Sequence, residues 1–268
     1  MIVSMDTLYH SEFSFLPARN EKGDLEYVDI ITSFASAQGD VRIPTELVLP
    51  RMSDEEQCRL FTEKLELIET CQHFFIQRKV SAWINLTPAI ANTLLSDAKF
   101  ASQVERLSFL ELAINENYPE LNNGKANPTL AALAARFPLV LTNYGAGGIS
   151  NRAIFDGLFK RVVLDKNFVQ QRITHISFEP FMRAILAQLF PSSESIIISG
   201  IDTPEMLARV LPLGFSAMQG ALWPAVPPAQ IISLAKIYPS YLLVFNRLLT
   251  VYTRDRRPYD PVFYYALA

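Results

Sequence analysis

Short apolar segments and helical periods alternate along most of the chain. Eight segments are short, rich in β-branched or aromatic residues, and bounded by Gly, Pro, Asn or Asp, which is the pattern of buried strands. Helical periods separate most of these segments. The predicted strands are residues 12–17, 25–34, 80–86, 108–114, 139–142, 161–164, 195–199 and 215–219.

Capping residues and prolines mark where several helices begin and end. Ser53, with Glu56 three residues later, forms a capping box and opens the longest helical period, which runs to Phe75. Thr87 and Thr203 each precede a proline at the first helical position. Two further helices are predicted, from residue 177 to about 191 and from residue 128 to about 136.

The order of these elements predicts an α/β fold. Eight strands that alternate with helices in about 235 residues are typical of a (β/α)8 barrel of the TIM type. Only residues 19–24 connect the first two strands, too few for a parallel crossover, so we expect these strands to pair antiparallel. A doubly wound open sheet is the alternative architecture, because the strand count fits both.

Composition describes a folded and mildly acidic chain. Its 268 residues are 50% hydrophobic and carry a formal net charge of −3, which excludes a disordered chain and offers no footprint for nucleic acid. Residues 1–15 lack a signal peptide's pattern, and no apolar run is long enough to span a membrane. Cys58 and Cys71 lie 13 apart in one predicted helix and cannot pair. We therefore expect a cytoplasmic protein with free thiols.

The composition changes after about Lys236. Six of the ten tyrosines and four arginines fall in the last 32 residues. We therefore divide the chain into a domain of residues 1–236 and an aromatic, arginine-rich C-terminal extension of residues 237–268. Residues 241–251 have the pattern of a short helix, and the extension is either an appendage of the barrel or an interaction surface.

Polar side chains follow successive strands, at the end of a β/α barrel where active sites lie. Their oxygen atoms are of the kind that binds Mg²⁺, although a metal hydrolase would need more carboxylates, and turn formation alone accounts for Asn143 and Asp202. These residues are Asp29, Asn85, Glu116, Asn143, Asp165, Asp202 and Gln219.

A glycine-rich segment, residues 143–150, resembles a dinucleotide-binding loop between a strand and a helix. Position 150 is Ser where the third glycine is required, so we favour a tight turn. His10, His73 and His175 lack the spacing of a metal site.

Four segments and the pair Gln219-Gly220 resemble the EAL family, which has the cyclic di-GMP phosphodiesterase fold. The resemblance covers about residues 12–230 and is strongest to a degenerate subgroup of enteric bacteria. It implies an EAL-type barrel with an antiparallel first strand pair. The segments are CQHFFIQ at 71–77, INENYP at 114–119, FDGLF at 155–159 and LWPAVP at 222–227.

The resemblance also implies which positions correspond to the family's site. Some keep a polar residue of the expected kind: the shortened signature carboxylate Asp29, the amides Asn85 and Gln219, and the acids Glu116 and Asp165. At others the family residue is replaced: Ser33 for a phosphate-contacting Arg, Ala113 for a Glu ligand, Thr142 and Asn143 for paired aspartates, Val163 for the catalytic Lys and Ser199 for the general-base Glu.

These replacements predict a chain that is not an enzyme. A two-metal phosphodiester hydrolase needs carboxylates to hold both cations and a base to activate water. Losing a general base alone costs about 10²–10⁴ in rate, and here the lysine and several ligands are lost as well. We therefore expect no catalytic residues, no metal and no cofactor.

The function implied by the resemblance is that of an anti-FlhDC factor. Such a protein binds FlhD, blocks FlhDC from flagellar promoters, promotes FlhDC degradation by ClpXP, and so represses motility without itself touching DNA or a membrane. The first alternative is a residual cyclic di-GMP phosphodiesterase or cyclic di-GMP receptor. The second is a pseudo-enzyme whose C-terminal extension recognises another partner. The sequence alone does not indicate which residues contact the partner.

Overall fold

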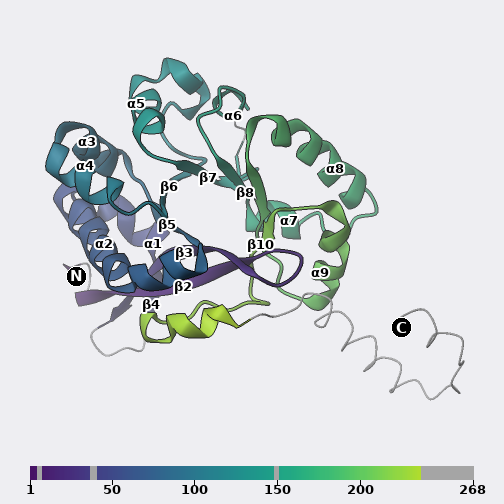
Figure 1. Ribbon diagram of the computed structural model, residues 1–268, viewed down its shortest axis with the longest axis horizontal. Helices are drawn as coiled ribbons and strands as arrows, with labels where there is room; N and C mark the ends of the chain where they lie inside the picture. Colours follow the sequence, from purple (N-terminus) through teal and green to yellow (C-terminus); the bar gives the residue numbers. More distant parts are fainter. Residues whose placement is uncertain (5–7, 37–40, 148–150, 237–268) are drawn as a thin grey trace, which may run out of the picture.

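The computed structural model describes residues 1–4, 8–36, 41–147 and 151–236, and the coloured ribbon of Figure 1 shows these ranges. The C-terminal extension at 237–268, with the helix predicted at 241–251, lies outside the described residues.

Eight strands in the described ranges close into a barrel, so the alternative of an open sheet is wrong (Figure 1). Around the barrel the order is β2, β10, β9, β8, β7, β6, β5 and β3, and β2 pairs with β3 to close the ring. Each strand lies at a predicted position. Their bounds are β2 Leu8–Arg19, β3 Leu25–Ser36, β5 Ser81–Asn85, β6 Leu110–Asn115, β7 Leu139–Tyr144, β8 Arg161–Leu164, β9 Ser195–Ile198 and β10 Ala217–Met218.

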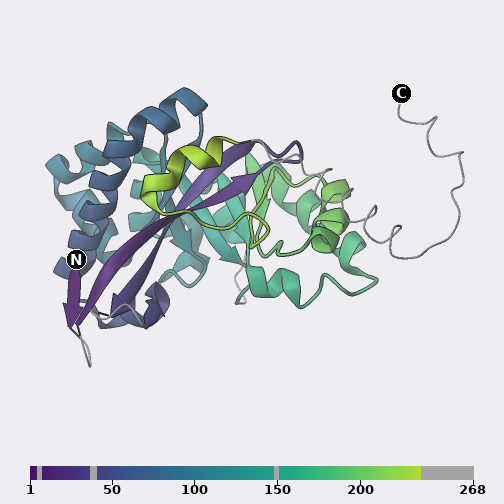
Figure 2. The ribbon, with the colours of Figure 1, turned by 90° about the horizontal axis from the view of Figure 1, so that it is seen from below.

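The first two barrel strands form a long antiparallel hairpin, as predicted. Their register runs from Tyr9↔Ser36 to Arg19↔Leu25. β3 pairs with β5 only over residues 27–29, so the hairpin continues past the barrel wall (Figure 2). Two short strands that the sequence did not predict, β1 (Ile2–Ser4) and β4 (Arg42–Pro44), flank this projection.

Helices cover the outside of the barrel, with α2 to α4 on one side and α8 and α9 on the other (Figure 1). The longest, α2 (Asp54–Arg78), begins with the predicted capping box between Ser53 and Glu56. The other α-helices are α1 Thr45–Val48, α3 Pro88–Ser96, α4 Ala98–Glu105, α5 Pro128–Arg136, α6 Arg152–Phe155, α7 Lys166–Gln170, α8 Phe178–Leu189 and α9 Pro204–Val210. Short 3-10 helices are η1 Leu49–Arg51, η2 Leu121–Ala126, η3 Phe190–Ser192, η4 Leu211–Leu213 and η5 Pro228–Ala235.

Apolar side chains fill the middle of the barrel lumen. One layer, separate from the main core between strands and helices, takes one residue from each of the eight strands, and each is at most 7% exposed. Such a layer makes the barrel interior a packed core rather than a channel. The layer consists of Ala18, Tyr27, Trp83, Ala113, Val140, Val163, Ile197 and Ala217.

A polar network closes the amino-terminal end of the lumen. The guanidinium of Arg161 lies 2.7 Å from Glu111 Oε2 and donates hydrogen bonds to Tyr27 Oη at 3.0 Å and Ser195 Oγ at 2.9 Å. Trp83 Nε1 donates to the same Glu111 oxygen at 2.9 Å. A buried carboxylate is therefore paired with a cation and with a neutral donor, which is what burial of a charge requires.

Candidate functional site

Most of the predicted site residues lie at or near the carboxyl-terminal end of the barrel strands, which we call the mouth. A cavity of about 440 Å³ opens there next to β7, β8, β9 and β10. Of the predicted residues, it is lined by Asn143, Asp165, Ser199 and Gln219. The other predicted residues lie outside its lining, so the structure brings only part of the predicted set to one cavity.

The glycine-rich loop after β7 encloses Glu116, a carboxylate that is only 4% exposed. Its Oε2 accepts a hydrogen bond from the Ala146 N–H at 2.8 Å, and its Oε1 accepts one from the Gly147 N–H at 3.3 Å. Positive φ angles at Asn143 (61°) and Gly145 (98°) turn the chain towards this carboxylate. In the described part of the segment, residues 143–147, the predicted tight turn is present, since the Ala146 N–H also bonds to the Asn143 carbonyl at 3.1 Å, and the amides of this turn bind the Glu116 side chain.

Asp165 and Gln219 also have structural partners. Asp165 caps α7, since its Oδ1 accepts a hydrogen bond from the Phe168 N–H at 2.7 Å. Gln219 Oε1 accepts from Ser199 Oγ at 3.3 Å, while its buried Nε2 has no partner among the described residues. Asp165 thus orders the edge of the mouth, whereas Gln219 keeps one unused donor inside it.

Asp202, the other acid predicted at the mouth, is held by three donors. Its Oδ1 accepts from the Ala221 N–H at 2.8 Å, and its Oδ2 lies 2.8 Å from Gln170 Nε2 and 3.0 Å from Lys166 Nζ. Burial alone would raise the pKa of Asp202, but these hydrogen bonds and the Lys166 charge lower it below its usual value. This carboxylate is a stable anion that joins loops of the mouth.

Five other predicted positions differ in their exposure. Asn85 is exposed and Ser33 is half-buried, while the Thr142 hydroxyl donates to the Ile114 carbonyl at 3.3 Å. Ala113 and Val163 belong to the apolar layer of the lumen. No polar chemistry is available from these two side chains.

Asp29 lies at the point where β3 stops pairing with β5. It pairs with Trp83 as the last residue of the β3–β5 contact, and it follows the lumen-facing Tyr27 at a spacing of two, so its side chain faces the lumen. Its Oδ1 is buried and has no hydrogen-bond partner among the described residues. Burial raises the pKa of Asp29 to about 6; the charge of Lys64 opposes this shift, and Glu46 adds to it.

Lys64 was missed by sequence reasoning. It lies on α2, is 4% exposed, and interacts electrostatically with Asp29. Burial lowers the pKa of Lys64 to about 8, and the Asp29 charge opposes this shift. The available signal was its position three residues after Phe61 and four before Ile68, in the apolar stripe of the helix.

The stability of the protein is expected to fall by about 2 kcal/mol between pH 4 and pH 6 because of Asp29. Its pKa is raised from 3.8 to about 6, so the native state holds a proton that the unfolded state has released in this range. Stability therefore decreases as pH rises through the window. Urea unfolding at several pH values should show this fall in the free energy of unfolding. In Asp29→Asn the fall between pH 4 and pH 6 should be smaller by about 2 kcal/mol. An equal slope in both proteins would contradict the prediction.

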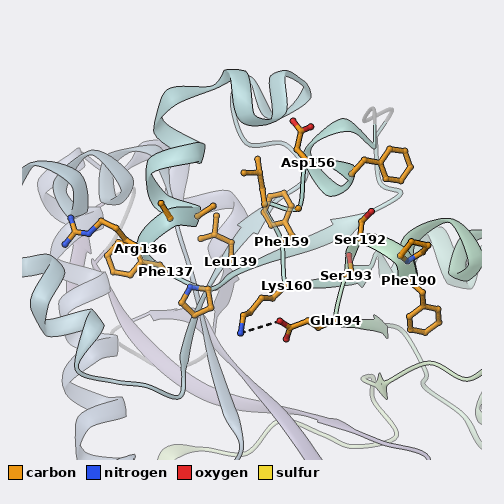
Figure 3. Close-up of a pocket in the computed structure, with 17 residues that line it drawn as sticks. Arg136, Phe137, Leu139, Asp156, Phe159, Lys160, Phe190, Ser192, Ser193 and Glu194 are labelled. Atoms are coloured by element: carbon orange, nitrogen blue, oxygen red, sulfur yellow. Dashed lines mark ion pairs between the residues drawn. The ribbon is translucent and has the colours of Figure 1, made fainter.

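A second cavity, of about 860 Å³, lies at the opposite end of β7, β8 and β9 (Figure 3). Phe155 and Phe190, 51% and 41% exposed, line it, and a Lys160–Glu194 ion pair of 3.6 Å crosses it. None of the predicted site residues lines this cavity. It is therefore separate from the mouth.

Comparison with known proteins identifies the family. The family model of the EAL domain matches residues 10–225. The chain belongs to the EAL domain family. It is 62% identical over 236 residues to the anti-FlhC(2)FlhD(4) factor YdiV of Salmonella paratyphi B, a match that covers 88% of this chain and all of that protein.

Two further comparisons agree with this EAL assignment. The putative anti-FlhC(2)FlhD(4) factor YdiV of Escherichia coli is 52% identical over the same length and coverage. The crystal structure of the EAL-like domain protein YdiV superposes with a TM-score of 0.80 at 53% identity, over 85% of this chain and 97% of that one. The predicted EAL-type barrel is confirmed.

The donor set of this EAL domain does not fit the divalent cations that the family's chemistry implies. The described residues contain no group of three or more His, Cys, Asp or Glu side chains that could hold a metal ion. Glu116 is bound by backbone amides, Asp165 caps a helix, and Asp202 is paired with Lys166. Mg²⁺ requires carboxylates that are free to coordinate it.

In the described ranges, no helix is long and apolar enough to cross a membrane.

Proposed function

We propose that this chain is a non-enzymatic regulator that acts on FlhDC by protein contact. The observation that carries the proposal is the 62% identity to an anti-FlhC(2)FlhD(4) factor over that protein's full length. In this proposal the chain binds FlhD, keeps FlhDC from flagellar promoters, promotes its degradation by ClpXP, and represses motility. It acts in the cytoplasm without a cofactor and without direct contact to nucleic acid or a membrane.

We further propose that the mouth is a vestigial EAL site. The Glu116 carboxylate, which backbone amides hold, and the apolar side chains in the lumen support this view, because they leave few free oxygen atoms for a cation. The vestigial positions are Asp29, Asn85, Glu116, Asp165 and Gln219. The degenerate positions are Ser33, Ala113, Thr142, Asn143, Val163 and Ser199.

A calorimetric titration of the protein with FlhD tests the proposal. We expect binding at micromolar affinity or tighter, and the same affinity with cyclic di-GMP present. In parallel, cyclic di-GMP incubated with the protein and Mg²⁺ or Mn²⁺ should show no turnover above the blank. Absence of FlhD binding would contradict the proposal and leave a pseudo-enzyme with another partner. Turnover of the nucleotide would contradict it and favour the residual enzyme.

The calorimetric titration with FlhD also tests the proposed division of the chain into a domain of residues 1–236 and a C-terminal extension of residues 237–268. The relatives match over 236 residues and leave 32 residues of this chain outside the match. A version that ends at residue 236 should bind FlhD with unchanged affinity. A large loss of affinity would instead assign recognition to the C-terminal extension.

A further inference from the structure

The cavity of Figure 3 is a groove at the amino-terminal end of the barrel strands, with a volume of about 860 Å³. Phe155 and Phe190 line it, and they are 51% and 41% exposed. Buried apolar side chains complete the lining, among them Phe137, Leu158 and Phe159. Large apolar side chains that stay exposed beside a cavity are typical of a binding surface. This amino-terminal groove therefore has the room and the apolar surface to bind side chains of another segment.

Ser193 adds a polar requirement to the amino-terminal groove. It lines the cavity, is 9% exposed, and its Oγ has no hydrogen-bond partner among the described residues. A buried hydroxyl without a partner is rare, because it has lost its hydrogen bonds to water. An occupant of this groove should therefore bring a hydrogen-bonding group as well as an apolar one.

The charged side chains that line the groove already have partners. The ion pairs are Lys160–Glu194 at 3.6 Å, Arg136–Glu105 at 2.8 Å and Asp156–Arg152 at 3.9 Å. An ionic occupant would have to compete with these pairs, whereas a neutral one would not. The groove thus suits a neutral aromatic group that carries a hydroxyl, which is the side chain of tyrosine.

The C-terminal extension, residues 237–268, has the matching composition. It holds six tyrosines in 32 residues. It also holds four arginines and two aspartates, a net charge of +2, so residues 1–236 carry −5 of the chain's total of −3. Opposite net charges favour the approach of the extension to the domain.

The extension begins at the end of the barrel that holds the groove. Arg19 donates to the Leu234 carbonyl at 2.9 Å, two residues before the described domain ends, and to the Gly23 carbonyl at 2.9 Å. Gly23 lies in the turn that enters β3 at its amino-terminal end. Across the lumen at this end, Tyr27 Oη lies 3.1 Å from Ser195 Oγ, so the width of the barrel separates this turn from the groove. A chain of 32 residues spans up to about 100 Å, which is more than that width.

We propose that residues 237–268 bind to the amino-terminal groove of their own chain, with a tyrosine ring against Phe155 and Phe190 and a tyrosine hydroxyl as the partner of Ser193 Oγ. This contact covers the two exposed phenylalanines and satisfies the buried hydroxyl. The extension lies outside the 236 residues that match the relatives, so the contact holds whether or not the chain acts on FlhDC.

Hydrogen exchange of the full chain, followed by mass spectrometry, tests the proposal. In the unmodified chain we expect amides within residues 237–268 to exchange at least about tenfold more slowly than in the double variant Phe155→Ser/Phe190→Ser. Both phenylalanines are exposed, so we expect the barrel of this variant to fold. Unchanged exchange of the β6, β7 and β8 amides checks that it does.

Two single variants complete the design. Phe181→Ser is the matched control, because Phe181 is also 41% exposed but does not line the groove, and it should leave exchange of the extension unchanged. Ser193→Ala removes one hydrogen bond and should speed exchange of the extension about fivefold. This variant decides the result if the double variant does not fold.

Four results would overturn the proposal. Fast exchange of residues 237–268 in the unmodified chain would show that the extension does not bind the domain. Equal protection in the unmodified chain and the groove variants would place the contact elsewhere. Protection that disappears on tenfold dilution would assign the groove to the extension of a second copy. Protection that appears only with phosphatidylglycerol vesicles would make the extension a membrane-binding segment. FlhD is absent from these measurements, so failure here is distinguishable from failure of the proposed function.

Discussion

Replacing Arg161 by methionine is expected to lower the free energy of unfolding by about 3–5 kcal/mol. The variant leaves the Glu111 carboxylate, which is 5% exposed, with the Trp83 N–H but without its cation. Uncompensated burial of a charge is among the costliest single changes in a protein core. The hydroxyl groups of Tyr27 and Ser195 lose the same donor.

Urea unfolding followed by circular dichroism measures this loss. Arg136→Met is the matched control, because Arg136 also pairs with a glutamate, Glu105, at 2.8 Å, but both side chains are over a third exposed. An exposed pair contributes about 0–1 kcal/mol. Adding Glu111→Leu to Arg161→Met should recover part of the loss. Equal effects of Arg161→Met and Arg136→Met would show that the network does not stabilise the barrel.

Gly220→Ala is expected to destabilise the fold by about 3 kcal/mol, the upper end for overpacking. A Cβ at this position would lie 2.3 Å from the Ile201 carbonyl oxygen and 2.4 Å from its nitrogen. Both are backbone atoms, which cannot rotate away as the end of a side chain can. The adjacent N–H of Ile201 bonds to the Gln219 carbonyl at 3.0 Å, so the displacement would open the β10 side of the mouth.

Gly147→Ala provides the control for this substitution at the same end of the barrel. Its Cβ would meet its nearest atom, Asn117 Oδ1, at 3.7 Å, an ordinary contact. We expect a change within about 0.5 kcal/mol, as for most surface substitutions. Thermal unfolding of both variants should show a lower Tm for Gly220→Ala only. A similar Tm for both would mean that the loop at Ile201 can shift at little cost.

The barrel strands were predictable because each has a local pattern. The connection at residues 19–24 is too short for a parallel crossover, so the antiparallel pairing of the first two strands was also predictable. β1 and β4 were not predicted, because each has three residues and pairs only where the hairpin projects past the barrel. Strands of that length carry no recognisable alternation.

The position of the mouth was predictable from the barrel topology, but the partners of its charged groups were not. Barrel topology alone brings the carboxyl ends of the strands together, and in the structure Asp165 and Gln219 line one cavity there. The partners of the charged groups come from distant parts of the chain: Glu116 bonds to the amide of Ala146, and Asp29 interacts with Lys64. Such contacts depend on packing between elements, which no local period encodes.

The Arg161–Glu111 network also bears on how such a protein can change over generations. The network lies at the end of the barrel opposite the mouth, with an apolar layer between the two. A substitution of a polar side chain at the mouth therefore leaves the Arg161–Glu111 network intact. In a fold built in this way, the mouth and the outer surface are both separate from the network that closes the lumen, so either can change by substitution while the chain stays folded.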